Sequence, residues 1–97
     1  MTDLSEKDKW LYVAVEDPGG NEKFVGLYDE ELDISYIPVF ETKEEALTCL
    51  VNMPDRGRRK YEVQAVLLDI LREDARNNGF LIFLSNGQGT VLKRIDP

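Results

Sequence analysis

The sequence predicts a single α+β domain, and three segments lead to this prediction. Residues 80–84 are consecutive apolar residues between Gly79 and a Ser-Asn-Gly turn, a pattern typical of a strand buried on both faces. Residues 10–15 (WLYVAV) form another apolar segment rich in strand-forming residues. Thr42-Lys-Glu-Glu45 has the spacing of a helix capping box. Because a strand buried on both faces needs covering layers, strands and helices must share one core.

Three strands are expected before the first helix. Residues 10–15 and 23–28 flank the segment DPGGN at residues 17–21, whose glycines can adopt positive φ, so we expect a hairpin. Residues 34–40 have the composition of a third strand. Pro38 cannot donate a hydrogen bond within a sheet. It therefore places this strand at an edge, or places its own nitrogen on an unpaired side.

The first helix is expected to follow Thr42 and to end before Pro54. One stripe of this helix is apolar and is predicted to face the sheet. The stripe consists of Ala46, Leu47, Leu50 and Val51. Cys49 is expected on or beside the stripe as a packed, unreactive thiol, since no neighbouring group would lower its pKa.

The segment after the first helix fits two patterns. Residues 61–66 alternate like a strand, yet their apolar positions also continue the helical spacing of the residues that follow. We favour a strand over residues 61–66 and then a helix over residues 68–78; one helix that begins at Tyr61 is the alternative. In both cases Gly79 is predicted to end the helix in the left-handed cap position.

The predicted element order is β-β-β-α-β-α-β-β, with a last strand over residues 90–95 after the buried strand. Residues 1–9 are a polar tail, and residues 10–97 form the domain. We expect a mixed sheet of five or six strands with two helices packed mainly on one face. The order of the strands within the sheet is left open by the sequence.

Composition limits the classes of function. The 97 residues carry a net charge of -7 and contain one cysteine and no histidine. The negative charge disfavours broad binding to nucleic acid or anionic lipid. Without histidine, Ser-His and Cys-His nucleophilic sites and most transition-metal sites are excluded, which weighs against an enzyme. A lone cysteine, a polar N-terminus and the lack of any apolar run near the ~20 residues of a membrane span predict a cytoplasmic protein.

Several short motifs resemble a small family of uncharacterised bacterial and plastid α/β domains. The matching elements are Tyr12-Val13, Asn21-Glu22 with Val25-Gly26, Phe40-Glu41 with Glu44-Glu45-Ala46, Glu62 to Val66, and Gly79-Phe80. The chain also resembles the N-terminal domain of the SseB family, through Pro38-Val39-Phe40 with Glu44 and Ala46, and through Asn78-Gly79 before the LIFL strand. Neither resemblance implies an activity or site residues. They imply a strand over residues 61–66 and an interaction role.

The basic segment after the first helix is the candidate binding site. Arg56, Arg58, Arg59 and Lys60 lie together on an otherwise acidic chain. Because arginine binds carboxylates and phosphates bidentately, these four residues are a possible partner-binding site for an acidic protein face or a phosphate. The structural alternative is a solvated loop whose charges pair with acids such as Glu62.

Two other segments have structural interpretations. Asp29, Glu30, Glu31 and Asp33 offer oxygen ligands to a hard cation but lack the EF-hand spacing, which predicts a solvated acidic loop. Residues 86–89 (NGQG) lack the spacing of phosphate-binding loops, which predicts a hairpin turn. The sequence therefore predicts no catalytic, cofactor-binding or metal-binding residue.

These observations favour a non-catalytic protein-interaction or regulatory module whose partner is another protein, with no cofactor and no membrane. Tyr28 and Tyr36 could anchor a partner if they share an exposed face. Two alternatives stay open. One is an anion- or nucleic-acid-binding accessory protein acting through residues 56–60, and the other is an unrecognised enzyme that uses carboxylates or lysine.

Overall fold

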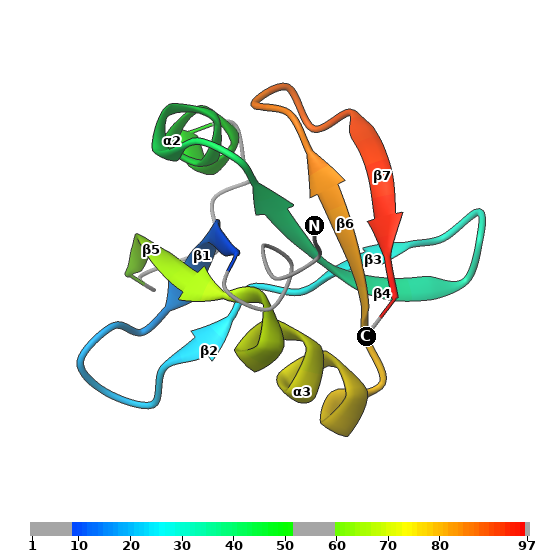
Figure 1. Ribbon diagram of the computed structural model, residues 1–97, viewed down its shortest axis with the longest axis horizontal. Coiled ribbons are helices and arrows are strands. Elements are labelled where there is room, and N and C mark those ends of the chain that lie inside the picture. Colours follow the sequence, from blue (N-terminus) through cyan, green and yellow to red (C-terminus); the bar gives the residue numbers. More distant parts are fainter. Residues whose placement is uncertain (1–8, 52–59, 97) are drawn as a thin grey trace, which may run out of the picture.

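Seven strands and two helices follow one another over residues 9–51 and 60–96, which are the residues that this computed structural model describes (Figure 1). The elements are β1 (Trp10–Glu16), β2 (Lys23–Phe24), β3 (Leu27–Asp29), β4 (Ile34–Phe40), α2 (Lys43–Val51), β5 (Tyr61–Leu67), α3 (Leu68–Asn78), β6 (Leu81–Ser85) and β7 (Val91–Ile95). The α+β class, the mixed sheet and the two helices are as predicted. The sheet has seven strands instead of five or six, and the order is β-β-β-β-α-β-α-β-β.

Strand β1 lies in the middle of the sheet because three strands pair with it. On one edge, β5 pairs antiparallel with β1 along its whole length. On the other edge, β4 pairs at Tyr12 and Val13, and β2 pairs at Val15 and Glu16. Beyond β4 follow β6, parallel to β4, and then β7, antiparallel to β6. Strand β3 pairs with the first half of β4. Among the described strands, β5 pairs only with β1 and β7 only with β6, so these two are the outermost strands across the sheet.

The additional strand arises because the predicted strand over residues 23–28 divides into β2 and β3. Val25, between them, still donates to the carbonyl of Ala14 at 2.9 Å, but β2 continues along β1 whereas β3 pairs with β4. A Cβ atom on Gly26 would lie 2.9 Å from Cζ of Phe80, so glycine leaves the room that this ring occupies. The break therefore involves a contact with a residue far along the chain, which the local pattern could not indicate.

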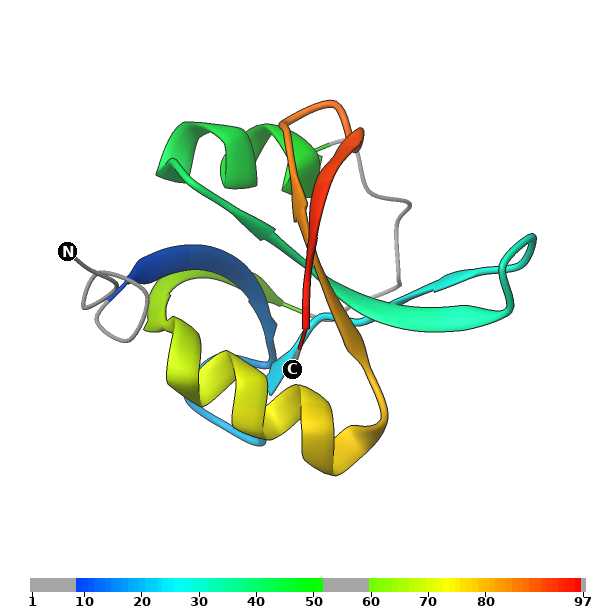
Figure 2. The same ribbon diagram turned by 45° about the vertical axis from the view of Figure 1, so that its right-hand side comes forward.

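The two helices lie on opposite faces of the sheet, which corrects the expectation that they share one face. Figure 2 shows α2 on one side of β1 and β5, and α3 on the other side. The main core lies under α3, where Leu71 and Ala75 pack with Leu11 and Val13. Residues alternate between the faces of a strand, so Ala14 points to the α2 side.

The direction of the two crossovers explains this arrangement. Strands β4 and β5 are both antiparallel to β1 and flank it, so the chain crosses β1 between them by way of α2. It then returns through α3 in the opposite direction, from β5 to β6, which is parallel to β4. Crossovers between parallel strands are right-handed, so two that run in opposite directions place their helices on opposite faces.

Strand β4 is internal, so the predicted edge position is wrong. Strand β6 pairs with β4 from Tyr36 to Val39. The opposite edge of β4 is shared, because β3 pairs up to Tyr36 and β1 pairs from Val39 onward. Ile37 and Pro38 lie between these two partners. The second alternative from the sequence, a proline nitrogen on an unpaired side, fits this gap, since a buried proline is tolerated where no partner needs its N–H.

Helix α2 begins at the predicted capping box, but its predicted apolar stripe is only partly correct. The amide of Glu45 donates to Oγ1 of Thr42 at 3.2 Å, and the Thr42 hydroxyl lies 3.4 Å from the Glu45 carboxylate. Ala46 is buried as expected, whereas Leu47 and Val51 are 43% and 82% exposed. The small Ala46 side chain faces the sheet, while the larger residues at the edge of the stripe point to solvent.

The prediction of a strand followed by a helix after residue 60 is confirmed. Strand β5 ends at Leu67, and α3 begins at Leu68, whose amide donates to the carbonyl of Lys9 at 2.9 Å. Gly79 ends α3 with φ 76°, the left-handed conformation that was predicted. Strand β6 is buried from Ile82 onward, as expected for a strand covered on both faces.

Candidate functional site

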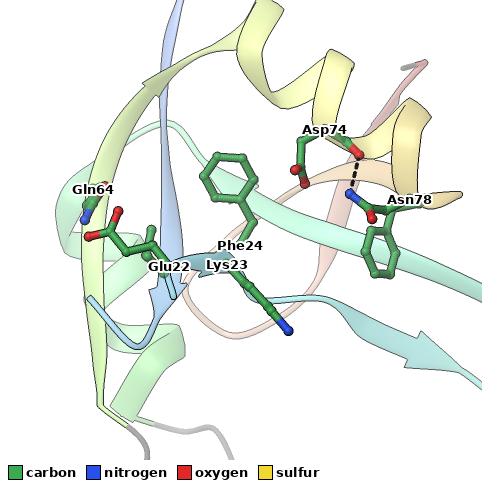
Figure 3. Close-up of a pocket in the computed structure, with 8 residues that line it drawn as sticks. Glu22, Lys23, Phe24, Gln64, Asp74 and Asn78 are labelled. Carbon is green, nitrogen blue, oxygen red and sulfur yellow. Dashed lines mark hydrogen bonds between the residues drawn. The ribbon is translucent and has the colours of Figure 1, made fainter. Parts of the chain in front are cut away.

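A cleft of about 490 Å³ lies between α3, β2 and β5, and we call it the main cleft (Figure 3). Its lining residues are Val15, Glu22, Lys23, Phe24, Gln64, Asp74, Asn78 and Phe80. The fold brings these residues together, because β2 and β5 both pair with β1 and α3 lies over one face of these strands. The volume lies within the range of about 300–1,000 Å³ that is usual for small-molecule sites.

The floor of the main cleft is apolar. Val15 is buried and belongs to the main core, and Phe24 and Phe80 are half-buried against that core. Phe24 pairs directly with Val15 in the sheet. Phe80 follows the helix cap, and its ring rests close to Gly26. Two aromatic rings therefore line one recess.

Polar side chains form two walls above this floor. Figure 3 shows Glu22 lying toward Gln64 of β5, with Asp74 and Asn78 on the α3 side and the ring of Phe24 between the two walls. The amide of Gly19 donates to Oε2 of Glu22 at 2.8 Å, and Nδ2 of Asn78 donates to the carbonyl of Asp74 at 2.9 Å. These hydrogen bonds orient one side chain on each wall.

The main cleft carries more negative than positive charge. Glu22 and Asp74 supply two carboxylates, and the ammonium of Lys23 extends away from α3 in Figure 3. Carboxylates attract a cation by charge, and aromatic faces attract one within about 6 Å of the ring centre. Over residues 9–51 and 60–96, no three His, Cys, Asp or Glu side chains group closely enough to hold a metal ion. Two carboxylates beside two aromatic rings suit an organic cation.

The predicted basic site lies almost entirely outside the described part of the chain. Arg56, Arg58 and Arg59 fall outside the described residues, so the role of the cluster stays a prediction. Lys60 is described and exposed, and its carbonyl accepts from the amide of Asp17 at 2.9 Å. This bond joins the start of β5 to the β1–β2 turn.

Both polar turns have the structures that the sequence predicted. In the acidic loop, Oδ1 of Asp29 accepts from the amides of Glu31 and Leu32 at 2.9 and 3.2 Å, so this carboxylate closes the turn. In the β6–β7 hairpin, Oδ1 of Asn86 accepts from the amides of Gln88 and Thr90, each at 3.0 Å. The side-chain oxygens of Asp29 and Asn86 are therefore used in local backbone hydrogen bonds.

The two tyrosines that could have formed an anchor lie on opposite faces of the β3–β4 hairpin. Tyr36 pairs with Leu27, whereas Tyr28 pairs with Ser35, so the two rings point to different sides. Tyr36 packs on Phe83 with ring centroids 4.6 Å apart. A shared aromatic anchor is thus excluded.

Local contacts raise the pKa of both tyrosine hydroxyls. The exposed hydroxyl of Tyr28 donates to Asp33, and this hydrogen bond is the main reason why the pKa of Tyr28 is raised. Partial burial, followed by the charge of Asp29, raises the pKa of Tyr36. Tyrosine hydroxyls are protonated at neutral pH even without such a shift, so the raised pKa values leave both side chains uncharged there.

Cys49 is half-buried on α2, which agrees with its predicted position beside the apolar stripe. Burial raises the pKa of its thiol above the ordinary value. A raised pKa leaves less thiolate at neutral pH, and thiolate is the reactive form. The environment of this cysteine therefore fits a packed thiol.

Comparison of the chain with protein-family models, curated proteins and solved structures gives no match. The two family resemblances suggested by short motifs therefore stay predictions. Neither of the described helices is long and apolar enough to cross a membrane.

No catalytic or binding motif of the sequence marks the residues of the main cleft as a site. Glu22 lies in a turn segment, and Asp74 and Asn78 resemble ordinary solvent-facing residues of an amphipathic helix. One local signal was present, since Asp74 and Asn78 are four residues apart and so share one flank of α3. Their proximity to Phe24 depends on the sheet topology, which the sequence left open.

Proposed function

We propose that the protein is a non-catalytic protein-interaction module whose main cleft receives a lysine or arginine side chain of a partner protein. The observation that carries this proposal is the position of Glu22 and Asp74 on opposite walls of a recess that Phe24 and Phe80 line. The net charge of -7 adds a long-range attraction for a basic partner. A cytoplasmic location belongs to the same proposal, since a chain with one cysteine needs no oxidising compartment.

The shape of the main cleft favours a side chain of a larger molecule. Glu22, Lys23 and Asn78 are exposed at the rim, whereas Val15 closes the floor. A long side chain can enter from the rim while its backbone stays outside. Its aliphatic stem would pack on the two rings, and its charged head would pair with a carboxylate.

A labelled peptide that carries one arginine between leucine residues tests this proposal by fluorescence polarisation. The matched peptide carries glutamine in place of arginine. We expect Asp74→Asn to weaken binding of the arginine peptide about tenfold, because hydrogen bonds to charged groups contribute about 1.5–3 kcal/mol. Asp69→Asn is the control variant, since Asp69 is an exposed residue of the same helix that does not line the cleft.

Equal binding of the arginine and glutamine peptides would contradict the proposal, and so would equal effects of Asp74→Asn and Asp69→Asn. Agmatine provides a third measurement, because it carries the guanidinium group without a peptide backbone. If agmatine binds as tightly as the peptide, then the main cleft is a small-amine site and the protein partner is refuted.

The alternative of an anion- or nucleic-acid-binding accessory protein acting through residues 56–60 stays a prediction, because three of its four basic residues lie outside the described part of the chain. Replacement of Arg56, Arg58, Arg59 and Lys60 by serine tests it. If these residues bind an anion or a nucleic acid, the replacement should abolish binding of that ligand. The melting temperature should change little, since exposed ion pairs contribute only about 0–1 kcal/mol.

A further inference from the structure

A second recess, which we call the α3–β7 cleft, lies on the same face of the sheet as the main cleft. Its volume is about 200 Å³. Its floor is apolar and is formed by Leu11, Leu68, Leu84 and Ile95. Three of these residues are buried in the main core, and Ile95 is packed against it. Figures 1 and 2 both show the end of β7 beside α3.

Basic side chains surround this floor, although the chain as a whole is acidic. The polar lining residues are Lys9, Arg72, Lys93, Arg94 and Asp96. Among the described residues, the basic lining residues thus outnumber the single acidic one at this recess, on a protein whose net charge is -7. They come from the start of β1, from α3 and from the end of β7, so only the folded chain brings them together. Lys93 pairs with Leu84 of the main core and so lies on the α3 face. Arg94 instead pairs with Phe83 and starts from the opposite face of β7.

We propose that the α3–β7 cleft binds an acidic segment of a partner protein, with an aliphatic side chain on the floor and carboxylates on the basic rim. The apolar floor accounts for the aliphatic group, and the basic lining residues Lys9, Arg72 and Lys93 account for the carboxylates. A volume of about 200 Å³ is below the range of about 300–1,000 Å³ for small-molecule sites. It is therefore suited to one side chain of a longer segment.

Two rim cations already form exposed ion pairs, with Nε of Arg94 and Nζ of Lys9 as the cationic atoms. Arg94 lies 3.3 Å from Asp96, and Lys9 lies 3.5 Å from Glu41, with every partner in these pairs substantially exposed. Nε of Arg72 donates to the backbone carbonyl of Asp96 at 3.2 Å, which fixes the end of β7 against α3. Exposed pairs of this kind contribute about 0–1 kcal/mol each. A partner carboxylate can therefore replace Glu41 beside Lys9, or Asp96 beside Arg94, at little cost.

An acidic protein segment fits the recess better than nucleic acid does. A nucleic acid would meet the repulsion of the whole acidic chain, whereas a short acidic segment meets mainly the local positive charge. Single-stranded nucleic acid also binds through stacking on aromatic side chains, and none of the described residues that line this cleft is aromatic. The aliphatic floor instead fits a leucine or isoleucine side chain.

The test uses the full chain and a labelled peptide of alternating glutamate and leucine. Two matched peptides separate the two parts of the proposal: glutamine replaces glutamate in one, and serine replaces leucine in the other. Lys93→Glu should weaken binding of the glutamate–leucine peptide about tenfold, and added salt should weaken it in the wild type. Lys43→Glu makes the same charge change on α2, on the other face of the sheet, and should leave binding within about twofold of wild type.

Both matched peptides should bind more weakly than the glutamate–leucine peptide, and melting curves of both variants establish that they fold. Equal binding by Lys93→Glu and Lys43→Glu would overturn the proposal, as would equal binding of the glutamine peptide. Tighter binding of a single-stranded oligonucleotide would show a nucleic-acid surface instead. Asp74→Asn should weaken only the arginine peptide, so failure at one cleft is distinguishable from failure at the other.

Discussion

Truncation of one leucine on each helix gives the sharpest test of the packing. Leu71 on α3 is 0% exposed and lies in the main core, whereas Leu47 on α2 is 43% exposed. Leu71→Ala removes buried atoms and leaves a cavity, which costs about 2–5 kcal/mol. Leu47→Ala leaves no enclosed cavity, and the removed atoms were already partly in water, so we expect a cost of about 1 kcal/mol or less.

The difference in stability between Leu71→Ala and Leu47→Ala is large enough to measure by urea unfolding followed by circular dichroism. Domains of this size have a free energy of unfolding of about 5–15 kcal/mol. Each kcal/mol shifts the melting temperature by about 4–8 °C, so Leu71→Ala should melt roughly 10 °C or more below wild type. The slope of the unfolding free energy against urea should stay unchanged if only stability changes. Equal losses for the two variants would refute the assignment of the buried face of each helix.

Three more predictions concern single residues. Gly26→Ala should cost about 1–3 kcal/mol, because its Cβ would lie 2.9 Å from the Phe80 ring, and Phe80→Leu in the same chain should recover part of that cost in a double-mutant cycle. Thr42→Ala should cost about 0.5–2 kcal/mol through the lost helix cap. Thr48→Ala on the same helix should cost less, since the Thr48 hydroxyl donates back to the carbonyl of Glu44 and caps no helix end; equal melting temperatures of the two variants would contradict this. Because burial raises the pKa of Cys49, its labelling by a thiol reagent should reach half its maximal rate at a higher pH in the folded than in the unfolded chain, and coincident pH profiles would oppose that shift.

Features that depend on neighbouring residues in the sequence were predictable. The capping box at Thr42, the cap at Gly79 and the β6–β7 turn all follow from local hydrogen bonding or from the φ that glycine permits. These signals act within a few residues, so a single sequence contains them. They fixed the α+β class and the order of most elements.

Features that depend on distant contacts were not predictable. The division of the strand over residues 23–28 involves the ring of Phe80. Strand β4 is internal because it pairs with β6 on one edge and with β3 and β1 on the other. The placement of the helices on opposite faces follows from the strand order, which the sequence left open. The two clefts also depend on distant contacts. In the α3–β7 cleft, for example, Lys9, Arg72 and Lys93 come together only after the sheet has formed.

Helix α3 separates the two clefts, and its geometry determines how they differ. Successive residues turn by about 100°, so the buried stripe of Leu71 and Ala75 has Arg72 on one flank and Asp74 with Asn78 on the other. The α3–β7 cleft contacts the first half of the helix and the main cleft contacts its second half. The helix dipole favours anions near the first turn and cations near the last, each by about 0.3–1 kcal/mol, which matches the ligand charge proposed for each cleft.

Because the helix body lies between the clefts, the two peptides should bind almost independently. Saturation with the arginine peptide should change the affinity for the glutamate–leucine peptide less than about threefold at a physiological ionic strength, where charges are screened beyond about 8 Å. Mutual exclusion of the two peptides would instead show that both compete for one surface, and the assignment of two separate clefts would then be wrong.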